Sequence, residues 1–151
     1  MDNIDRKILL QLQRDARISN LELAEKVGLS PTPCARRVKR LEDEGYITAY
    51  RAELSREKLG LNLSALISIS MDRHTPDRFE NFEREVSAMP EIVACNLVTG
   101  QSADYLLTAL VADMTHYEKF LLGKLTKIDG VTGVHSSFVL REVPVAGSVL
   151  L

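Results

Sequence analysis

The sequence predicts an α+β protein in which a small helical domain, residues 1–60, precedes an antiparallel sheet domain, residues 61–151. Two observations predict this class. Three short amphipathic helix patterns, the third strongly basic, occupy the first part of the chain. The second part alternates strand and helix patterns in the order βαββαβ. A chain of 151 residues is long enough for two small domains of this kind.

The first two helix patterns each begin with an N-cap signal. The first helix is expected from about Asn3 to Arg14, with Asp2 as its cap. Ser19 and Glu22 stand three residues apart and form a capping-box pattern at the start of the second helix. Gly28 suits the left-handed position that ends this helix, and a three-residue turn then leads to the third pattern.

The third helix pattern is the most informative stretch of the chain. Ser30 can cap it, and Pro31 fits its first position, where a missing N–H costs nothing. Apolar residues at i, i+4 and i+7 give it one inward face, whereas its cations point elsewhere. A helix, a turn containing glycine and a basic helix make a helix-turn-helix, which suits the major groove of DNA. The alternative is a solvated surface helix that happens to be basic.

The polar side chains of this helix suit DNA in different ways. Arginine offers a rigid donor fork for guanine or phosphate, and Thr32 can contact a thymine methyl group or a phosphate. The hydroxyl of Ser30 and the free N–H groups of the first turn suit a phosphate. The candidate DNA contacts are Ser30, Thr32, Arg36, Arg37, Lys39 and Arg40, with Arg51 as a weaker phosphate candidate.

The segment after the third helix is expected to form a small wing. Thr48 to Leu54 alternates enough for a strand, which makes the domain a winged helix-turn-helix, and the hinge is expected near Gly60. Residues 1–58 carry 12 Lys and Arg against 10 Asp and Glu, whereas the rest carry 7 against 11. Because the positive charge is concentrated on one helix, it favours local groove binding over general coating of nucleic acid.

The second domain shows four strand patterns and two helix patterns. One helix opens at Thr75-Pro76, and Asp113 caps the other. This is the ferredoxin-like order, in which both helices cover one face of a four-stranded antiparallel sheet. The strands are expected at Leu63–Met71, Ile92–Thr99, Tyr105–Ala112 and Val131–Val143.

Both faces of the middle strands are apolar, although the fold covers only one of them with helices. A second apolar face calls for a second cover, and a partner subunit is the simplest supplier. The alternative is that the wing or the tail from Val143 to Leu151 covers this face. In the strand at 92–98, Ile92, Ala94 and Val98 are expected on one face and Val93, Cys95 and Leu97 on the other.

Several function classes find no support in the sequence. No apolar run reaches the ~18 residues that span a bilayer, and the N-terminus lacks a signal-peptide pattern, so a cytoplasmic protein without a membrane partner is expected. Cys34 and Cys95 are expected to be ordinary buried thiols without a metal site. No glycine-rich phosphate loop, metal cluster or triad supports an enzyme, and no cofactor is expected. The three histidines are assigned no role: His74, His116 and His135.

Blocks of residues along nearly the whole chain carry a family resemblance. They are Asp5, Ile8-Leu9, Leu23-Ala24, Ser30 to Cys34, Arg36 to Glu42, Gly45 to Ile47, Gly100, Asp104 to Leu107, and Asp113-Met114. In these blocks the chain resembles the Lrp/AsnC (feast/famine) family of transcriptional regulators. The resemblance implies a homodimer that typically assembles into an octamer and binds a free amino acid between dimers. Effector binding in such proteins alters assembly or DNA affinity.

The resemblance also points to an effector site in the second domain. It matches Leu97, Met114, Phe138, Val139 and Leu140 to effector-responsive positions, all of them apolar. An apolar pocket favours leucine or methionine, whereas the alternative is that these residues are simply core.

The polar ends of a free amino acid need partners of their own. The loop from Gly100 to Asp104 can offer N–H groups to a carboxylate, and Asp104 can hold the ammonium or order the loop. This loop is one residue longer than in many family members, and Ser136 and Ser137 add hydroxyls. The candidate effector contacts are Leu97, Gly100, Gln101, Asp104, Met114, Ser136, Phe138 and Leu140.

The sequence thus predicts an amino-acid-responsive transcriptional regulator that binds double-stranded DNA. One alternative is an effector-independent protein of the same family that organises DNA by wrapping it. Another is an enzyme built on the sheet domain, for which the sequence offers no catalytic motif.

Overall fold

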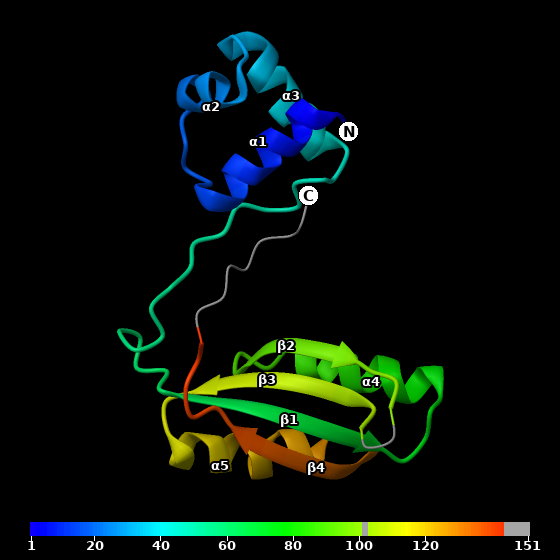
Figure 1. The fold of residues 1–151 in the computed structure, drawn as a ribbon. Coiled ribbons are helices and arrows are strands. Elements are labelled where there is room, and N and C mark those ends of the chain that lie inside the picture. Colours follow the sequence, from blue (N-terminus) through cyan, green and yellow to red (C-terminus); the bar gives the residue numbers. More distant parts are fainter. Residues whose placement is uncertain (101–102, 144–151) are drawn as a thin grey trace. The chain divides into compact units, whose positions relative to one another are not determined.

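The computed structural model describes residues 1–100 and 103–143, so residues 101–102 and 144–151 lie outside the described part. The described chain forms two compact units, Met1–Leu54 and Ser55–Val143. Figure 1 shows their helices and strands, with three helices in the first unit and a sheet with its helices in the second. Nearly all of the tail that was considered as a cover for the sheet falls outside the described residues.

The first unit consists of α1 (Asn3–Arg14), α2 (Asn20–Val27) and α3 (Pro31–Asp43). Two capping boxes hold the helix starts; the sequence predicted the box of α2 and, for α1, only the cap at Asp2. Asp2 and Asp5 form the box of α1, and Ser19 and Glu22 form the box of α2. Gly28 ends α2 with a φ of 74°, a left-handed conformation that an L side chain makes costly. The local sequence signals therefore set the helix boundaries.

A hydrogen bond and an apolar core fix α3 against the other two helices. The side-chain amide of Asn20 donates to the carbonyl oxygen of Pro31 at 2.9 Å, which ties the start of α2 to the start of α3. Beneath this contact, apolar side chains from all three helices are buried together. The core consists of Ile8, Leu9, Leu23, Ala24, Val27, Cys34 and Leu41. Burial of these side chains is the main force that holds the helix-turn-helix together.

The prediction of a strand at Thr48 to Leu54 was wrong. The segment is irregular, and no neighbouring strand of the described chain offers it a hydrogen-bonding edge. A strand needs such a partner for its backbone N–H and C=O groups. Instead the Tyr50 hydroxyl donates to Glu42 of α3 at 2.8 Å, which fastens the segment by a side chain.

The second unit has the predicted βαββαβ order, with a short 3₁₀ turn before the last strand. Its four strands lie in the antiparallel order β2-β3-β1-β4. Three of the four strands end earlier than expected, and the last one stops at Phe138 rather than Val143. The elements are β1 (Leu63–Met71), α4 (Pro76–Ser87), β2 (Ile92–Leu97), β3 (Tyr105–Val111), α5 (Met114–Gly123) and β4 (Val131–Phe138).

Helices α4 and α5 cover one face of this sheet. Phe82 from α4 and Phe120 from α5 pack with alternate residues of the central strands β1 and β3, which are fully buried. On the opposite face Leu66 and Leu106 remain 52% and 45% exposed. Nothing within the described unit covers that face, which leaves leucine side chains in water on the central strands.

The predicted faces of β2 need a correction, and Cys95 on this strand is exposed, whereas the sequence predicted a buried thiol. The pairing of β2 with β3 shifts between Ile92 and Ala94, so strict alternation fails at this point. Ile92, Cys95 and Leu97 pair with Ala109, Leu107 and Tyr105, which all belong to the helix-covered face, whereas Ala94 pairs with Thr108. One extra residue at an irregularity of this kind moves every following side chain to the other face.

Candidate DNA-binding and effector sites

The predicted DNA contacts lie on α3, but they face two directions. Cys34 and Leu41 point into the core, so the outward stripe of α3 consists of Thr32, Arg36 and Lys39 at i, i+4 and i+7. These three residues are exposed. In the part of the chain that the structure describes, Arg36 forms no ion pair, whereas Lys39 pairs with Asp43 at 3.2 Å.

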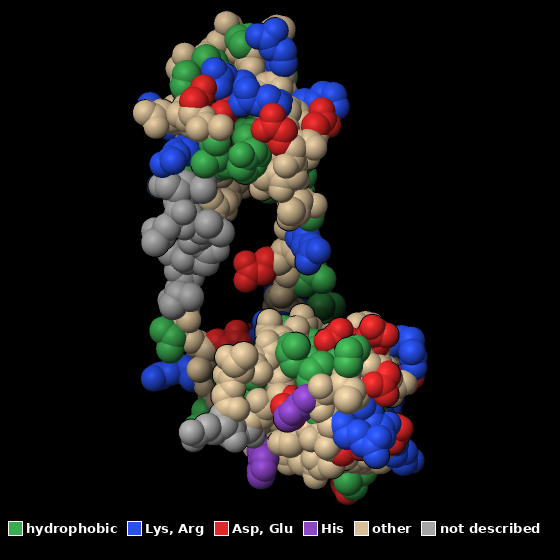
Figure 2. Space-filling view, turned by 90° about the vertical axis from the view of Figure 1, so that its right-hand side faces the viewer, with side chains coloured by type: hydrophobic (Ala, Val, Ile, Leu, Met, Phe, Trp, Pro, Cys, Tyr) green, Lys and Arg blue, Asp and Glu red, His purple; other side chains and the backbone are tan. Residues whose placement is uncertain are grey.

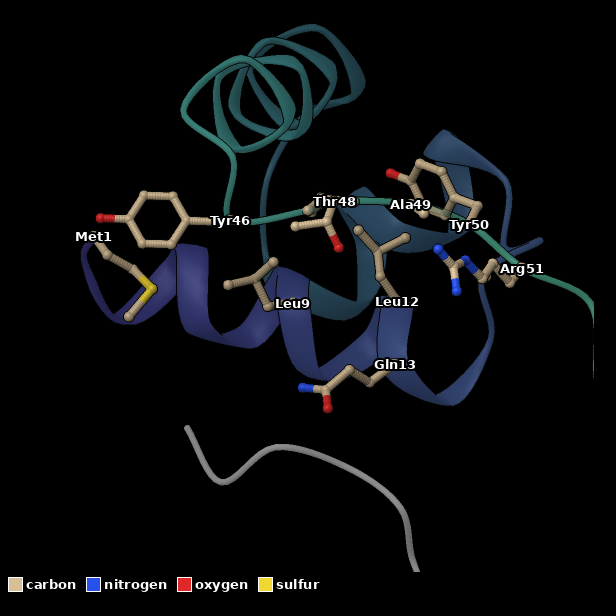
Figure 3. Close-up of a pocket in the computed structure, with 11 residues that line it drawn as sticks. Met1, Leu9, Leu12, Gln13, Tyr46, Thr48, Ala49, Tyr50 and Arg51 are labelled. Carbon is tan, nitrogen blue, oxygen red and sulfur yellow. The ribbon is translucent and has the colours of Figure 1, made fainter. Parts of the chain in front are cut away.

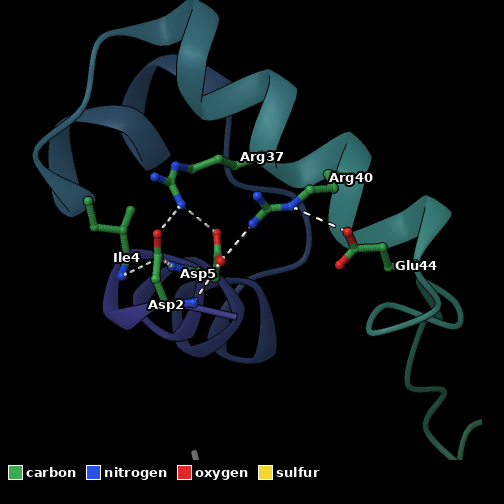
Figure 4. Close-up of polar contacts among 6 residues, drawn as sticks. All are labelled: Asp2, Ile4, Asp5, Arg37, Arg40 and Glu44. Carbon is green, nitrogen blue, oxygen red and sulfur yellow. Dashed lines mark hydrogen bonds and ion pairs between the residues drawn. The ribbon is translucent and has the colours of Figure 1, made fainter.

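The other two arginines of α3 reach back to the start of α1 (Figure 4). The guanidinium of Arg37 donates to Asp2 at 2.6 Å and to Asp5 at 2.8 Å. Arg40 donates to the other oxygen of Asp5 at 2.7 Å and lies 3.8 Å from Glu44. We call these four residues, Asp2, Asp5, Arg37 and Arg40, the acid clamp. Figure 2 shows the same mixture of cationic and acidic side chains on the helical unit.

The acid clamp changes the proton affinity of its members. A hydrogen bond from the backbone N–H of Asp5, together with the Arg37 guanidinium, lowers the pKa of Asp2 to about 2. Burial opposes ionisation of Asp5, but hydrogen bonds from the Asp2 backbone and Arg37 outweigh it and lower the pKa of Asp5. The same carboxylates raise the pKa of Arg37. Asp2 and Asp5 are therefore ionised and Arg37 is protonated near neutral pH.

The start of α3 offers fewer anion-binding groups than the sequence suggested. Ser30 occupies the N-cap position, as predicted, but its side chain accepts no capping hydrogen bond. Pro31 and Pro33 have no N–H, and the N–H of Cys34 already donates to the Ser30 carbonyl oxygen at 3.2 Å. The N–H of Thr32 is consequently the one backbone donor left in the first turn, beside the free hydroxyls of Ser30 and Thr32.

An apolar groove runs along α1 beneath the segment that was expected to be a wing (Figure 3). Met1 and Tyr46 lie at one end, Leu9 lies in the middle, and Tyr50 and Arg51 lie at the other end. The groove has a volume of about 430 Å³. Arg51, the weaker phosphate candidate, thus lines this groove on an irregular segment rather than standing on a strand.

The loop between β2 and β3 is anchored by Asp104. One carboxylate oxygen accepts the Met71 backbone N–H at 2.7 Å, and the other pairs with His74 at 2.8 Å. The backbone of Asp104 also joins Ile69 and Val98, each through a 2.8 Å hydrogen bond. Gly100 lies at the start of this loop, and the candidate Gln101 falls outside the described residues. Asp104 therefore closes the loop onto the end of β1.

The remaining effector candidates lie on other parts of the second unit. Ser136 hydrogen-bonds the Tyr117 hydroxyl, and Phe138 packs edge-on against the Tyr117 ring at 5.0 Å between centroids. Met114 is exposed at the start of α5, and Leu140 is 99% exposed just beyond β4. Tyr117 thus connects two of the predicted residues, although sequence reasoning gave it only a core position.

Within one described chain the candidates do not form a single pocket. Leu97 on β2 lies level with Ile69 of β1, whereas Phe138 on β4 lies level with Ala65. The two positions are three strand spacings apart across the sheet and four residues apart along it. With usual strand dimensions this places them roughly 20 Å from each other. A ligand as small as an amino acid cannot touch both ends within one chain.

Some residues that shape these sites carried no usable sequence signal. His74 lies 30 residues from its partner Asp104, and Asp5 lies 32 and 35 residues from the two arginines it holds. The sequence indicated Asp2 as a helix cap but gave no sign of the ion pairs that Asp2 and Asp5 form with α3. In the described ranges, no helix is long and apolar enough to cross a membrane.

Known families match both units of the fold. A winged helix-turn-helix DNA-binding model matches residues 1–48, and the Lrp/AsnC ligand binding domain model matches residues 64–148. Fold and site thus define a class, the non-enzymatic transcriptional regulators that combine a DNA-binding domain with an amino-acid-binding domain. The chain belongs to the Lrp/AsnC family.

Individual relatives agree with this assignment. The leucine-responsive regulatory protein of Haemophilus influenzae is 48% identical over 143 residues, which cover 95% of this chain and 86% of that protein. The Escherichia coli K12 protein of that name is 46% identical, with coverages of 95% and 87%. A transcriptional regulator of Neisseria meningitidis, solved in complex with L-Met, superposes with a TM-score of 0.93 at 43% identity, covering 99% and 96% of the two chains. An AsnC family regulator from Agrobacterium tumefaciens gives 0.92 at 34%, covering 99% and 97%.

Proposed function

We propose that this regulator reads operator DNA with α3 and responds to leucine or methionine. The observation that carries the first part is the outward stripe of α3. Thr32, Arg36 and Lys39 are exposed on the face opposite the core, where a helix entering the major groove presents its side chains. Ser30 and the Thr32 N–H stand at the helix start and can bind a flanking phosphate.

The choice of a small apolar effector is supported by exposed apolar side chains. Leu97 and Met114 are each 54% exposed and Leu140 almost fully so, which is unfavourable unless a ligand or partner covers them. The Neisseria meningitidis neighbour was solved with L-Met, and close relatives are leucine-responsive regulatory proteins. These apolar residues supply contacts for the effector side chain, and the loop from Gly100 to Asp104 supplies polar groups for its main chain.

The separation of the effector candidates supports a site shared between subunits. Because roughly 20 Å separates the β2 side from the β4 side of the sheet, we propose that a second subunit completes each pocket. Phe138 and Ser136, held by Tyr117, then form the wall on the β4 side. In this proposal Asp104 orders the loop, since its oxygens already bind Met71 and His74.

The uncovered face of the sheet supports assembly. Leu66 and Leu106 on the central strands would be buried by the same face of a second copy, which gives a two-fold dimer. Four such dimers then form the octamer that the family resemblance implies. Residues 1–60 serve as the DNA-binding domain and residues 61–151 as the effector and assembly domain of a cytoplasmic regulator.

A thermal-shift screen against the twenty amino acids tests the effector. A ligand at about 100 times its dissociation constant stabilises the protein by about 2.7 kcal/mol. We expect a selective shift with leucine or methionine, whereas a shift with only lysine or aspartate would overturn the specificity. DNase footprinting on genomic fragments then tests DNA reading. One short protected operator supports a local regulator, and long protection with helical phasing supports the DNA-organising alternative.

A further inference from the structure

We propose that Asp5 is a positioning residue for DNA recognition, which holds Arg37 and Arg40 away from the DNA. Only Thr32, Arg36 and Lys39 then read the duplex from α3. This inference rests on the proposed DNA-binding function and adds a division of labour among the four cations of α3. The residues that carry it lie within the helical unit (Figure 4).

The Asp5 carboxylate accepts three hydrogen bonds within the acid clamp. One oxygen accepts from Arg37 at 2.8 Å. The other accepts from Arg40 at 2.7 Å and from the backbone N–H of Asp2 at 2.9 Å. Asp5 is only 1% exposed, so its charge is shielded from water and depends on these partners. Asp2 adds a second carboxylate on Arg37 at 2.6 Å.

Release of these arginines to DNA would therefore be unfavourable. If Arg37 moved to a phosphate, Asp2 would lose its ion-pair partner and the buried Asp5 would keep only Arg40, and removing a partner from a buried ion pair is strongly destabilising. Arg36 has no ion-pair partner among the described residues, so it breaks no ion pair when it binds DNA. Arg36 and Arg37 have the same side chain, but binding DNA costs Arg37 its ion pairs and costs Arg36 none.

The phase of α3 leads to the same division for Arg37, whereas Arg40 has a 46% exposed side chain and is set apart only by its ion pairs with Asp5 and Glu44. Arg36 falls on the outward stripe with Thr32 and Lys39, directly opposite the buried Cys34 and Leu41. Arg37 is one residue further around the helix, on the side that faces α1, and its side chain is only 26% exposed. When a DNA groove receives the outward stripe of α3, the side chain of Arg36 points into the groove. The side chain of Arg37 points sideways, toward α1.

The division predicts a regulator with few phosphate contacts. Non-specific binding to DNA comes almost wholly from cations that neutralise phosphates, and each contact adds about 0.9 to the slope of log K against log salt. Two arginines neutralised by carboxylates contribute nothing to that slope. The acid clamp thus lowers the affinity for non-specific DNA but leaves Thr32, Arg36 and Lys39 available to read bases. The ratio of specific to non-specific affinity rises as a result.

Neighbouring arginines provide a matched test in the full-length protein. Affinity is measured across a salt series for two duplexes of equal length, one carrying the site that the wild-type protein selects from a random library and one scrambled. Arg36→Gln should weaken binding to the selected duplex by roughly 5- to 150-fold, the range for loss of a bidentate base contact. Arg37→Gln should leave the salt slope unchanged on both duplexes and lower only the melting temperature.

Asp5→Asn should have the opposite effect. It removes the carboxylate that holds Arg40 and leaves Arg37 with Asp2 alone, so the specificity ratio should fall. The salt slope on the scrambled duplex should steepen by about 0.9 if Arg40 alone is released and by about 1.8 if Arg37 follows. The double variant Asp5→Asn with Arg37→Gln should reverse only the part of that change that Arg37 contributes. Circular dichroism checks folding, and the Arg36 and Arg37 comparison decides the matter even if the Asp5 variants unfold.

Two different failures can be told apart. If Arg37→Gln flattens the salt slope by about 0.9, Arg37 contacts a phosphate and the positioning role of Asp5 is overturned. A folded Asp5→Asn protein with unchanged slope and specificity ratio also overturns it. If neither Arg36→Gln nor Lys39→Gln alters binding to the selected duplex, the assignment of DNA reading to α3 is itself wrong.

Discussion

The anchoring role of Asp104 gives the sharpest prediction for the second unit. Asp104→Ala removes the acceptor of the Met71 N–H, a donor buried at the end of β1. Hydrogen bonds to a charged acceptor contribute about 1.5–3 kcal/mol. The ion pair with the largely exposed His74 adds at most about 1 kcal/mol. We therefore expect Asp104→Ala to destabilise the second unit by about 2–3 kcal/mol.

Asp104→Asn separates loop ordering from direct capture of an ammonium group. The amide oxygen can still accept the Met71 N–H, so stability should fall by only about 1 kcal/mol. If Asp104 only orders the loop, effector affinity measured by calorimetry should change by less than roughly tenfold, which corresponds to 1.4 kcal/mol.

Differential scanning calorimetry without effector gives the two stability values. In a domain of this size, 1 kcal/mol shifts the melting temperature by roughly 4–8 °C. Equal melting temperatures for Asp104→Ala and the wild type would refute the anchoring argument. A folded Asp104→Asn protein that no longer binds effector would instead show that the carboxylate holds the ammonium.

Three further predictions concern the helical unit. Gly28→Ala should destabilise it by about 1–2 kcal/mol because of the left-handed φ of 74°, whereas Gly28→Asn should cost less; chemical denaturation measures both. Leu41→Ala should cost about 2–5 kcal/mol, since this side chain is fully buried, and an unaltered denaturation midpoint would contradict that packing. Asp2 has a pKa of about 2 in the folded protein against an ordinary 3.8, so its stabilisation is present above about pH 4 and is lost as the pH falls toward 2. Acid titration of Asp2→Asn should show a smaller loss over that window than the wild type, and identical curves would count against the ion pair with Arg37.

Local signals in the sequence predicted most of the helical unit. Capping boxes at Asp2 and Ser19, and the glycine at position 28, each act within one turn, so a short window of sequence contains the whole cause. The segment from Thr48 to Leu54 shows the limit. Its alternation fits a strand, but a strand exists only with a partner, and the described chain provides none.

The candidate DNA-binding and effector sites depend on contacts between residues far apart in the sequence, which no local sequence pattern shows. Arg36 and Arg37 look alike in the sequence, and only the packing of α1 on α3 separates them. The irregular pairing at Ile92 and Ala94 likewise inverted the predicted faces of β2. The described effector candidates all lie in the second unit, and their spread over the sheet follows from strand order, which sequence spacing does not show.

The acid clamp also bears on how quickly such a regulator finds its operator. A protein that searches a chromosome spends most of its time on wrong sequence, and each phosphate contact lengthens every such stop. In the proposed arrangement Arg37 and Arg40 stay paired with carboxylates of α1, which would shorten the time that the protein spends on non-target DNA. In this way Asp5, which is buried at the start of α1, would affect how fast the protein finds its operator.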